Sequence, residues 1–218
     1  DFLSIADNFL HFAHLPNDSH PIFFPDKSHL VKLQFVVLMF LVYQTVLKVP
    51  LTNKFRYADS EHIAGELMKR FNRPRPIPTE FANKLKQIDP VRGEQLSNNL
   101  ERGLMAIPLV AHEALTTAYI NDVDGNGVFA QQLYGYGRRG DVFLGISTSG
   151  NSKNVISATV VARALGIKVI ALTGNTGGEL AKIADVAVIV PEKETYMIQE
   201  LHIPIYHCWC LMLEEYFF

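Results

Sequence analysis

Four hydroxyl side chains follow a short apolar run near the middle of the chain. The run spans 142–146, and an apolar-periodic helix is predicted over 155–164. A strand that opens onto a helix N-terminus offers backbone N–H groups and a favourable dipole to an anion, and hydroxyl groups can donate to its oxygens. The pattern therefore predicts a phosphate-binding loop, whose hydroxyl residues are Ser147, Thr148, Ser149 and Ser152.

A simpler interpretation exists for any one of these residues. Ser152 or Asn151 could only cap the following helix, which is the commoner role of a single serine at this position. Four hydroxyl residues within one turn favour the anion instead. The loop has no lysine and does not match the nucleotide-binding pattern GxxxxGK[ST], which argues against a P-loop.

A histidine and a glutamate lie four residues apart in a predicted helix over 59–71. His62 and Glu66 share one face of that helix and could bind one metal ion or one substrate. In a helix without other information, an exposed polar pair is the commoner interpretation. The neighbouring face is apolar and predicts the core contact of the helix, through Ile63, Leu67 and Phe71.

The C-terminal stretch 196–218 predicts an amphipathic helix with Pro204 inside it, where a kink or the true helix start is expected. Gln199 and His207 lie eight residues apart, about 80° around an ideal helix, and can face one cavity. A lone histidine in such a helix is usually structural. Because the pair of His62 and Glu66 lies elsewhere in the chain, His207 becomes a stronger candidate for a functional residue.

The elements that must position these groups alternate between strands and helices. Apolar runs over 142–146, 168–173 and 186–190 predict strands, with helices between them at 155–164 and 179–184. This order predicts a parallel sheet with right-handed crossovers. Ligands of such sheets bind beyond the carboxyl ends of the strands, where the hydroxyl loop lies.

The segment before these strands carries weaker signals. Residues 79–102 are polar and predict a surface insertion or subunit contact, 107–110 predicts a short strand, and 111–119 and 128–133 predict helices. Residues 121–127 resemble the start of a calcium loop. The glutamate that should close such a loop is absent, because the apolar helix occupies its place, so a turn is the favoured interpretation and calcium the alternative.

Residues 1–57 differ in composition from the rest. They contain no glycine and no glutamate, are rich in phenylalanine, and hold four histidines whose spacing follows no metal-ligand template. The apolar stretch 35–47 is shorter than the ~20 residues of a membrane span, so a buried or partner-facing helix is favoured over membrane association. We interpret 1–57 as a divergent, helical N-terminal segment.

Three motifs in order resemble a known family. They are Ser-Thr-Ser-Gly-Asn-Ser at 147–152, Leu-Thr-Gly-Asn-Thr-Gly-Gly at 172–178 and Ile-Gln-Glu-Leu-His-Ile-Pro-Ile-Tyr-His at 198–207. Together they resemble the SIS (sugar isomerase) phosphosugar-binding domain, and within it the bacterial phosphoheptose isomerases. The resemblance covers 58–218 and implies an α/β fold, with a three-layer, doubly wound parallel sheet flanked by helices.

The resemblance also implies a reaction and its residues. The family interconverts sedoheptulose 7-phosphate and D-glycero-D-manno-heptose 7-phosphate through an enediol, as a homotetramer. By resemblance Glu66 and His207 are the acid–base pair, and the hydroxyl loop with Asn121 and Asp122 binds the substrate. One zinc ion per site is implied, with four ligands: His62, Glu66, Gln199 and His207.

One part of the family pattern is missing. A Gly-rich turn should precede the helix that starts at Ala58, but residues 51–57 read Leu-Thr-Asn-Lys-Phe-Arg-Tyr. Without glycine this backbone cannot approach a ligand as closely. We hypothesise a frameshifted or rearranged gene. An intact Gly-rich reading in another frame of the locus would support this, and its absence would contradict it.

Other functions remain as alternatives. One branch of SIS proteins is non-catalytic and associates with the bacterial replication initiator, but its members do not keep equivalents of both Glu66 and His207, so catalysis is favoured here. A sugar-phosphate-sensing regulator is disfavoured because no helix-turn-helix segment is visible. An inactive product of the altered N-terminus is a further alternative.

The charge and the cysteine content of the sequence indicate which partners and which cellular compartment to expect. The formal net charge is −2, which gives no reason to expect a nucleic-acid partner. Cys208 and Cys210 are two residues apart in a predicted helix and point in different directions, so no disulfide between them is expected. With no signal-peptide pattern at the start of the sequence, we expect a cytoplasmic protein without membrane partners.

Overall fold

The computed structural model describes residues 58–218, and within them three strands form one parallel sheet. The strands are β1 (Val142–Ser147), β2 (Lys168–Gly174) and β3 (Val186–Val190), arranged in the order β1-β2-β3. Ser147 pairs with Thr173 at the carboxyl end of the sheet. All three predicted strands are confirmed, and the loops that follow β1 and β2 meet at one edge of the sheet.

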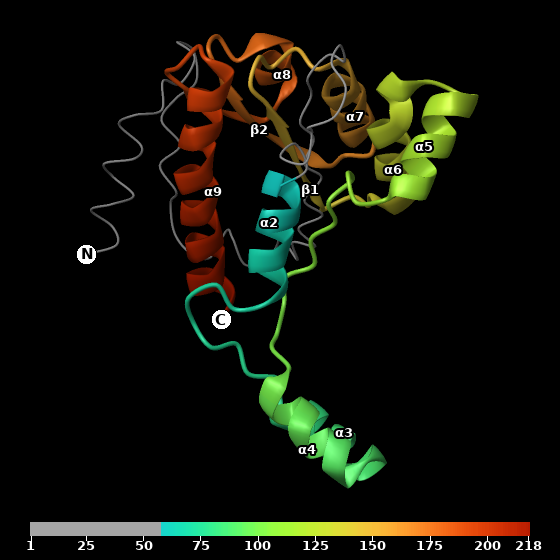
Figure 1. The fold of residues 1–218 in the computed structure, drawn as a ribbon, viewed down its shortest axis with the longest axis vertical. Helices are drawn as coiled ribbons and strands as arrows, with labels where there is room; N and C mark the ends of the chain where they lie inside the picture. The colour runs from blue at the N-terminus through green and yellow to red at the C-terminus, as the bar shows by residue number, and fades with distance from the viewer. Residues whose placement is uncertain (1–57) are drawn as a thin grey trace.

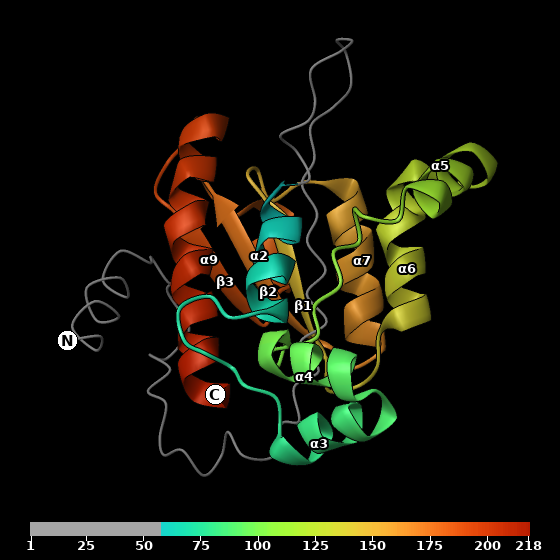
Figure 2. The same ribbon diagram turned by 60° about the horizontal axis from the view of Figure 1, so that its bottom comes forward.

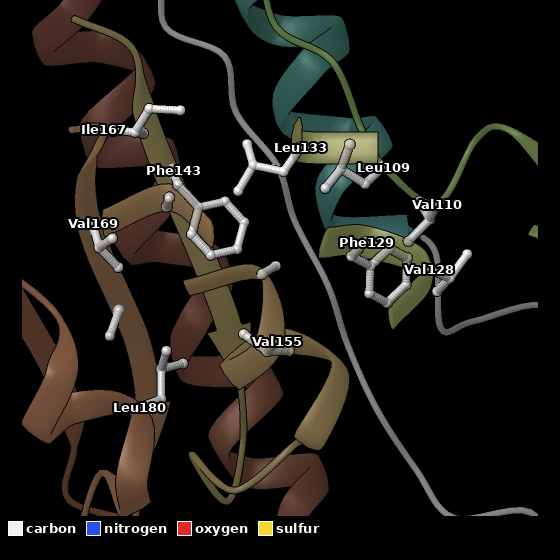
Figure 3. Packing of buried hydrophobic residues seen from close by; sticks show 13 residues of the cluster. Leu109, Val110, Val128, Phe129, Leu133, Phe143, Val155, Ile167, Val169 and Leu180 are labelled. Atoms are coloured by element: carbon white, nitrogen blue, oxygen red, sulfur yellow. The ribbon is translucent and has the colours of Figure 1, made fainter. Parts of the chain in front are cut away.

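One face of the sheet packs against three helices (Figure 3). These are α6 (Val128–Tyr136), α7 (Lys153–Ala164) and α8 (Gly178–Ile183). Strand residues point alternately to the two faces, and Phe143 and Val169 contribute to this side. The buried cluster also includes Leu109, Val128, Phe129, Leu133, Val155, Ala158, Ala162, Ile167 and Leu180.

The other face packs against α2 (Ala58–Met68) and α9 (Thr195–Phe217), which lie side by side on the sheet in both overall views (Figures 1 and 2). Its buried cluster comprises Ile63, Ala64, Leu67, Ala106, Leu144, Ile146, Leu172, Tyr206 and Cys210. Helices on both faces of a parallel sheet make three layers. The predicted three-layer α/β class is confirmed.

Helix α2 ends at Met68, three residues before the predicted end at Phe71. The chain leaves the helix because its last groups find other partners. The carbonyl of Leu67 accepts hydrogen bonds from the Leu104 amide at 2.8 Å and from Arg75 Nη1 at 2.8 Å. The amides of residues 71–73 donate instead to the carboxylate of Glu214 on α9.

The predicted insertion at 79–102 forms a helical hairpin of α3 (Thr79–Ile88) and α4 (Pro90–Asn99). It extends away from the three layers (Figure 1). Asp89 ends α3 and caps α4 by accepting hydrogen bonds from the amides of Val91 and Arg92. Several apolar side chains of the hairpin are exposed, and the predicted role in a subunit contact stays a prediction.

The strand predicted at 107–110 is wrong. These residues follow no strand and lead through a turn to α5 (Glu113–Asp122). Pro108 lacks an amide donor, and the carbonyl of Leu109 accepts a hydrogen bond from Gln132 Nε2 at 3.0 Å, in place of a neighbouring strand. Leu109 is nevertheless buried, which is why its apolar character suggested a strand.

The predictions for the N-terminal segment, which concern the divergent block 1–57 and the apolar stretch 35–47, fall outside the described residues. No helix within 58–218 combines the length and the apolar character that a bilayer crossing requires. Both cysteines are free, as predicted. Helix α9 runs through Pro204, as one of the two alternatives for this proline allowed, and starts at Thr195.

Candidate active site

The hydroxyl loop leaves β1 at Ser147 and enters α7 after Ser152. The two hydroxyl groups lie 2.8 Å apart and are hydrogen-bonded to one another in a buried position. Ser152 occupies the N-cap position of α7 but makes no side-chain capping bond. The simple capping interpretation is therefore wrong for Ser152, whose hydroxyl turns toward the start of the loop.

A second loop, 174–178, supports the first. Gly150 has φ +65°, and a Cβ atom there would lie 1.9 Å from the carbonyl oxygen of Gly177. The Thr148 carbonyl accepts from the amide of Gly174 at 3.0 Å, and Asn151 Oδ1 accepts from the amide of Glu179 at 3.0 Å. Only glycine fits at this crossing, so the two motifs read from the sequence form one structure.

His62 and Glu66 of α2 meet His207 of α9. The rings of His62 and His207 have centroids 5.0 Å apart at 80°, and His62 Nε2 lies 3.6 Å from Glu66 Oε1. The Glu66 side chain is 16% exposed and its other oxygen contacts Lys69 Nζ at 3.2 Å. Three of the predicted site residues, from segments about 140 positions apart in the sequence, therefore form one cluster.

Two residues that sequence reasoning missed orient this cluster. His62 Nδ1 lies 3.2 Å from the hydroxyl of Tyr206, and that hydroxyl donates to Asp59 Oδ1 at 3.4 Å. Burial, with the nearby Asp59 carboxylate, raises the pKa of Tyr206. The contact occupies Nδ1 and leaves Nε2 facing Glu66. Two features of the sequence could have indicated these residues. Tyr206 directly precedes His207, and Asp59 lies at the start of the predicted helix that carries His62 and Glu66.

The electrostatics of the cluster favour neutral imidazole at His207. Burial lowers the pKa of His207, and the neighbouring His62 lowers it further, while Glu66 opposes them. Among residues 58–218, the buried Nε2 atom of His207 has no hydrogen-bond partner. A neutral imidazole with an unpaired nitrogen can accept a proton or coordinate a metal ion.

Gln199 lies in the second turn of the same helix, which starts at Thr195. Its neighbour Ile198 packs against Gly174, where a Cβ atom would come 2.4 Å from the isoleucine side chain. Gln199 makes no hydrogen bond to His62, Glu66 or His207 among the described contacts. Eight residues correspond to a rise of about 12 Å, so the angular argument from sequence omitted the distance along the helix axis.

The remaining predicted residues lie elsewhere. Asn121 and Asp122 are exposed at the end of α5, and no described hydrogen bond joins them to the hydroxyl loop. The loop after them forms the short helix η2 (Gly125–Gly127), capped by Asp124, which accepts from the amide of Asn126. An open pocket of about 480 Å³ between 107–114 and α6 contains none of the predicted site residues.

Comparison with known proteins connects this geometry to a family. Residues 96–174 match the model of the SIS domain. The phosphoheptose isomerase of Sulfurimonas denitrificans is 40% identical over 161 residues, which cover 74% of this chain and 69% of that protein. The phosphoheptose isomerase of Aneurinibacillus thermoaerophilus is 38% identical over 81% of this chain and 77% of its own length. The chain belongs to the phosphoheptose isomerase family.

Solved structures agree with this assignment. The phosphoheptose isomerase of Neisseria gonorrhoeae shares 32% identity and a TM-score of 0.56, over 79% of this chain and 74% of that one. That of Francisella tularensis shares 26% identity and a TM-score of 0.60, over 82% of this chain and 77% of its own. The resemblance inferred from three short motifs is confirmed, and with it the SIS-type fold.

The zinc ion implied by the phosphoheptose isomerase family finds suitable donors here. Imidazole nitrogen and carboxylate oxygen are ordinary zinc ligands. The buried Nε2 of His207 has no hydrogen-bond partner within the described part of the chain, and a metal ion would satisfy it. However, these donor atoms are not arranged around one common position for a metal ion. Among residues 58–218, no group of three His, Cys, Asp or Glu side chains is arranged to hold a metal ion.

Proposed function

We propose that this protein is a phosphoheptose isomerase, which interconverts sedoheptulose 7-phosphate and D-glycero-D-manno-heptose 7-phosphate. The observation that carries the proposal is the cluster of His62, Glu66 and His207, together with a sheet whose first strand ends in the hydroxyl loop. Family membership supports the same reaction. A coupled assay on sedoheptulose 7-phosphate, with and without added zinc, tests it. Protein that binds this ketose phosphate but never exchanges a C1 proton with solvent would contradict it.

Aldose–ketose isomerisation moves a proton between two adjacent carbons, so a base and an acid must face the same bond of the sugar. We assign these roles to Glu66 and His207. The largely shielded carboxylate of Glu66 can take a proton from carbon, and the imidazole of His207 can exchange one with the neighbouring oxygen. The lowered pKa of His207 favours its neutral form, which can take the proton of the substrate hydroxyl group and return it to the carbonyl oxygen, while Glu66 returns the carbon-bound proton to the adjacent carbon.

Zinc would be held by His62, Glu66, Gln199 and His207 in this proposal. When bound, the cation supplies Lewis-acid stabilisation of charge on the substrate oxygen. The orientation of His62 by Tyr206 supports its role as a ligand, because a hydrogen bond at Nδ1 directs Nε2 toward the site. The distance of Gln199 along α9 makes it the weakest of the four ligands.

The substrate phosphate would bind at the hydroxyl loop, with Asn121 and Asp122 as further substrate contacts. The support for the loop is its position at the carboxyl end of the sheet and the rigid crossing of Gly150 with Gly177. A fixed phosphate holds the reacting carbons against the acid–base pair. We further propose a cytoplasmic protein that has no nucleic-acid or membrane partner.

Ser152→Ala should weaken the binding of phosphorylated sugars by ~1 kcal/mol or more, the loss of a hydrogen bond to a charged group. The same is expected of Ser149→Ala. Folding should change little for Ser149, which is exposed, and modestly for Ser152, whose hydroxyl pairs with Ser147. Isothermal titration with sugar phosphate measures the effect. If both variants bind as the parent does, the phosphate lies elsewhere.

A homotetramer is the assembly that the family implies, and exposed apolar side chains on α3, α4 and α9 agree with buried contacts in an oligomer. Light scattering on purified protein should therefore give the mass of a tetramer. A clean monomer at micromolar concentration would contradict this proposal and would point to an interface disrupted by the divergent segment 1–57.

A further inference from the structure

A buried carboxylate on α9 binds the segment that follows α2. Glu214 is 1% exposed, and its two oxygens accept four hydrogen bonds. Oε1 accepts from the Phe71 amide at 2.9 Å and from Arg75 Nε at 2.8 Å. Oε2 accepts from the amides of Asn72 at 2.8 Å and Arg73 at 3.0 Å. Every donor belongs to the stretch that directly follows α2.

Arg75 completes the connection from the other side. Its side chain is fully buried, and besides Glu214 it donates from Nη1 to the carbonyl of Leu67 at 2.8 Å and from Nη2 to the carbonyl of Glu66 at 3.2 Å. These are among the last carbonyls of α2, which have no partner within the helix. Arg75 and Glu214 thus form one buried unit, which we call the α2–α9 clamp.

The clamp reaches both members of the candidate acid–base pair. On one side Arg75 holds the backbone carbonyl of Glu66 itself. On the other side Glu214 holds the amide of Phe71, whose ring lies 5.4 Å from the ring of His207. Glu214 lies two helical turns from His207 along α9, and no described hydrogen bond joins the clamp to the Glu66 carboxylate or to the His207 ring.

We propose that Glu214 and Arg75 are positioning residues, which set the register of α2 against α9 and so hold Glu66 and His207 at their working separation. This inference rests on the proposed isomerase function. A buried, fully paired ionic group fixes one arrangement of its neighbours, because any slide of one helix leaves a charge unpaired. Proton transfer is sensitive to such a slide, since a misplacement of about 1 Å can lower a rate about 100-fold.

Glu214→Gln tests the proposal with little change in volume. The amide offers one acceptor oxygen and one NH₂ group, so two of the four donors now face another donor. Glu215→Gln is the matched control: the neighbouring carboxylate pairs with Arg73 at 2.7 Å, but both side chains are more than half exposed. We expect Glu214→Gln to lower kcat about 10- to 100-fold with KM for sugar phosphate unchanged, and Glu215→Gln to match the parent.

A second measurement does not depend on activity. With selectively labelled histidine, nuclear Overhauser contacts between the His62 and His207 rings should be present in the parent and in Glu215→Gln, and lost or weakened in Glu214→Gln. Circular dichroism at the assay temperature must show all three proteins folded.

The outcomes separate the two proposals. The clamp proposal is overturned if a folded Glu214→Gln variant keeps both the parent kcat and the contact between the His62 and His207 rings. It is also overturned if Glu215→Gln loses this ring contact to the same extent as Glu214→Gln. If the ring contact depends on Glu214 but the parent isomerises no sugar, the clamp stands as a positioning device and the proposed function fails. If kcat falls only in step with the folded fraction, Glu214 has a structural role alone.

Discussion

Glu66→Gln should lower the turnover of sedoheptulose 7-phosphate by roughly 10²–10⁴-fold, and His207→Asn should do the same, because this is the usual contribution of a positioned acid or base. The first change keeps the size of the side chain but removes the carboxylate. The second removes the imidazole beside His62. A coupled assay of product formation measures both effects.

The double variant should lose little more than the worse single variant, because both residues serve one proton-transfer path. Binding of sugar phosphate should survive in all three, since the loop from Ser147 to Ser152 is untouched. Lys69→Met is a useful control, because Lys69 contacts Glu66 from an exposed position and has no assigned role. Additive losses in the double variant would place the two residues on separate steps.

Arg75→Met should lower the free energy of unfolding by ~3–5 kcal/mol, the usual cost of removing one partner of a buried ion pair. Glu214 would keep its three amide donors but lose the cation beside it, and the carbonyl of Glu66 would lose its only described donor. Arg73→Met is the matched control, because its ion pair with Glu215 is exposed and should contribute ~1 kcal/mol or less. Urea unfolding of the three proteins measures the difference.

The pH dependence of unfolding gives an independent check on this pair. Burial raises the pKa of Glu214, but the three amides and Arg75 outweigh it, so the pKa lies below 4.5. A carboxylate with a lowered pKa in the folded state stabilises the protein above its unfolded-state pKa, and this stabilisation is lost as the pH falls through the folded-state value. Arg75→Met should show a smaller loss on acidification. Equal stability of Arg75→Met and the parent at pH 7 would contradict the assigned role.

The sheet was predictable from sequence because its strands are mostly apolar and the first two end in loops of distinct composition. Val142–Ser147 is buried at every position, so periodicity and burial agree. The strand predicted at 107–110 failed for a physical reason: Leu109 is as buried as any strand residue, but a side-chain amide from Gln132 satisfies its carbonyl. Apolar character reports burial and does not report which group completes the backbone hydrogen bonds.

The sequence indicated which residues belong to the candidate site better than it indicated how they are arranged in space. His62 and Glu66 share a helix, so their spacing alone placed them together. The approach of His207 depended on the packing of α2 against α9, which only the family motif indicated. Asp59, Tyr206 and the α2–α9 clamp were missed, because each acts through a contact between segments about 140 residues apart.

The hydroxyl loop and the second loop, 174–178, cross at Gly150 and Gly177, and this crossing limits when the hydroxyl loop can fold during synthesis. The carbonyl of Gly150 accepts its hydrogen bond from the amide of Leu180, thirty residues further along the chain. The hydroxyl loop therefore cannot take its final form on a ribosome until the chain as far as α8 has emerged. Before that point, β1 and α7 can pack together, but the hydroxyl loop between them lacks its hydrogen bonds with the residues from Gly174 to Leu180. Sugar phosphate should thus have little affinity for nascent chains that stop before residue 174, however well their first strand and helix have formed.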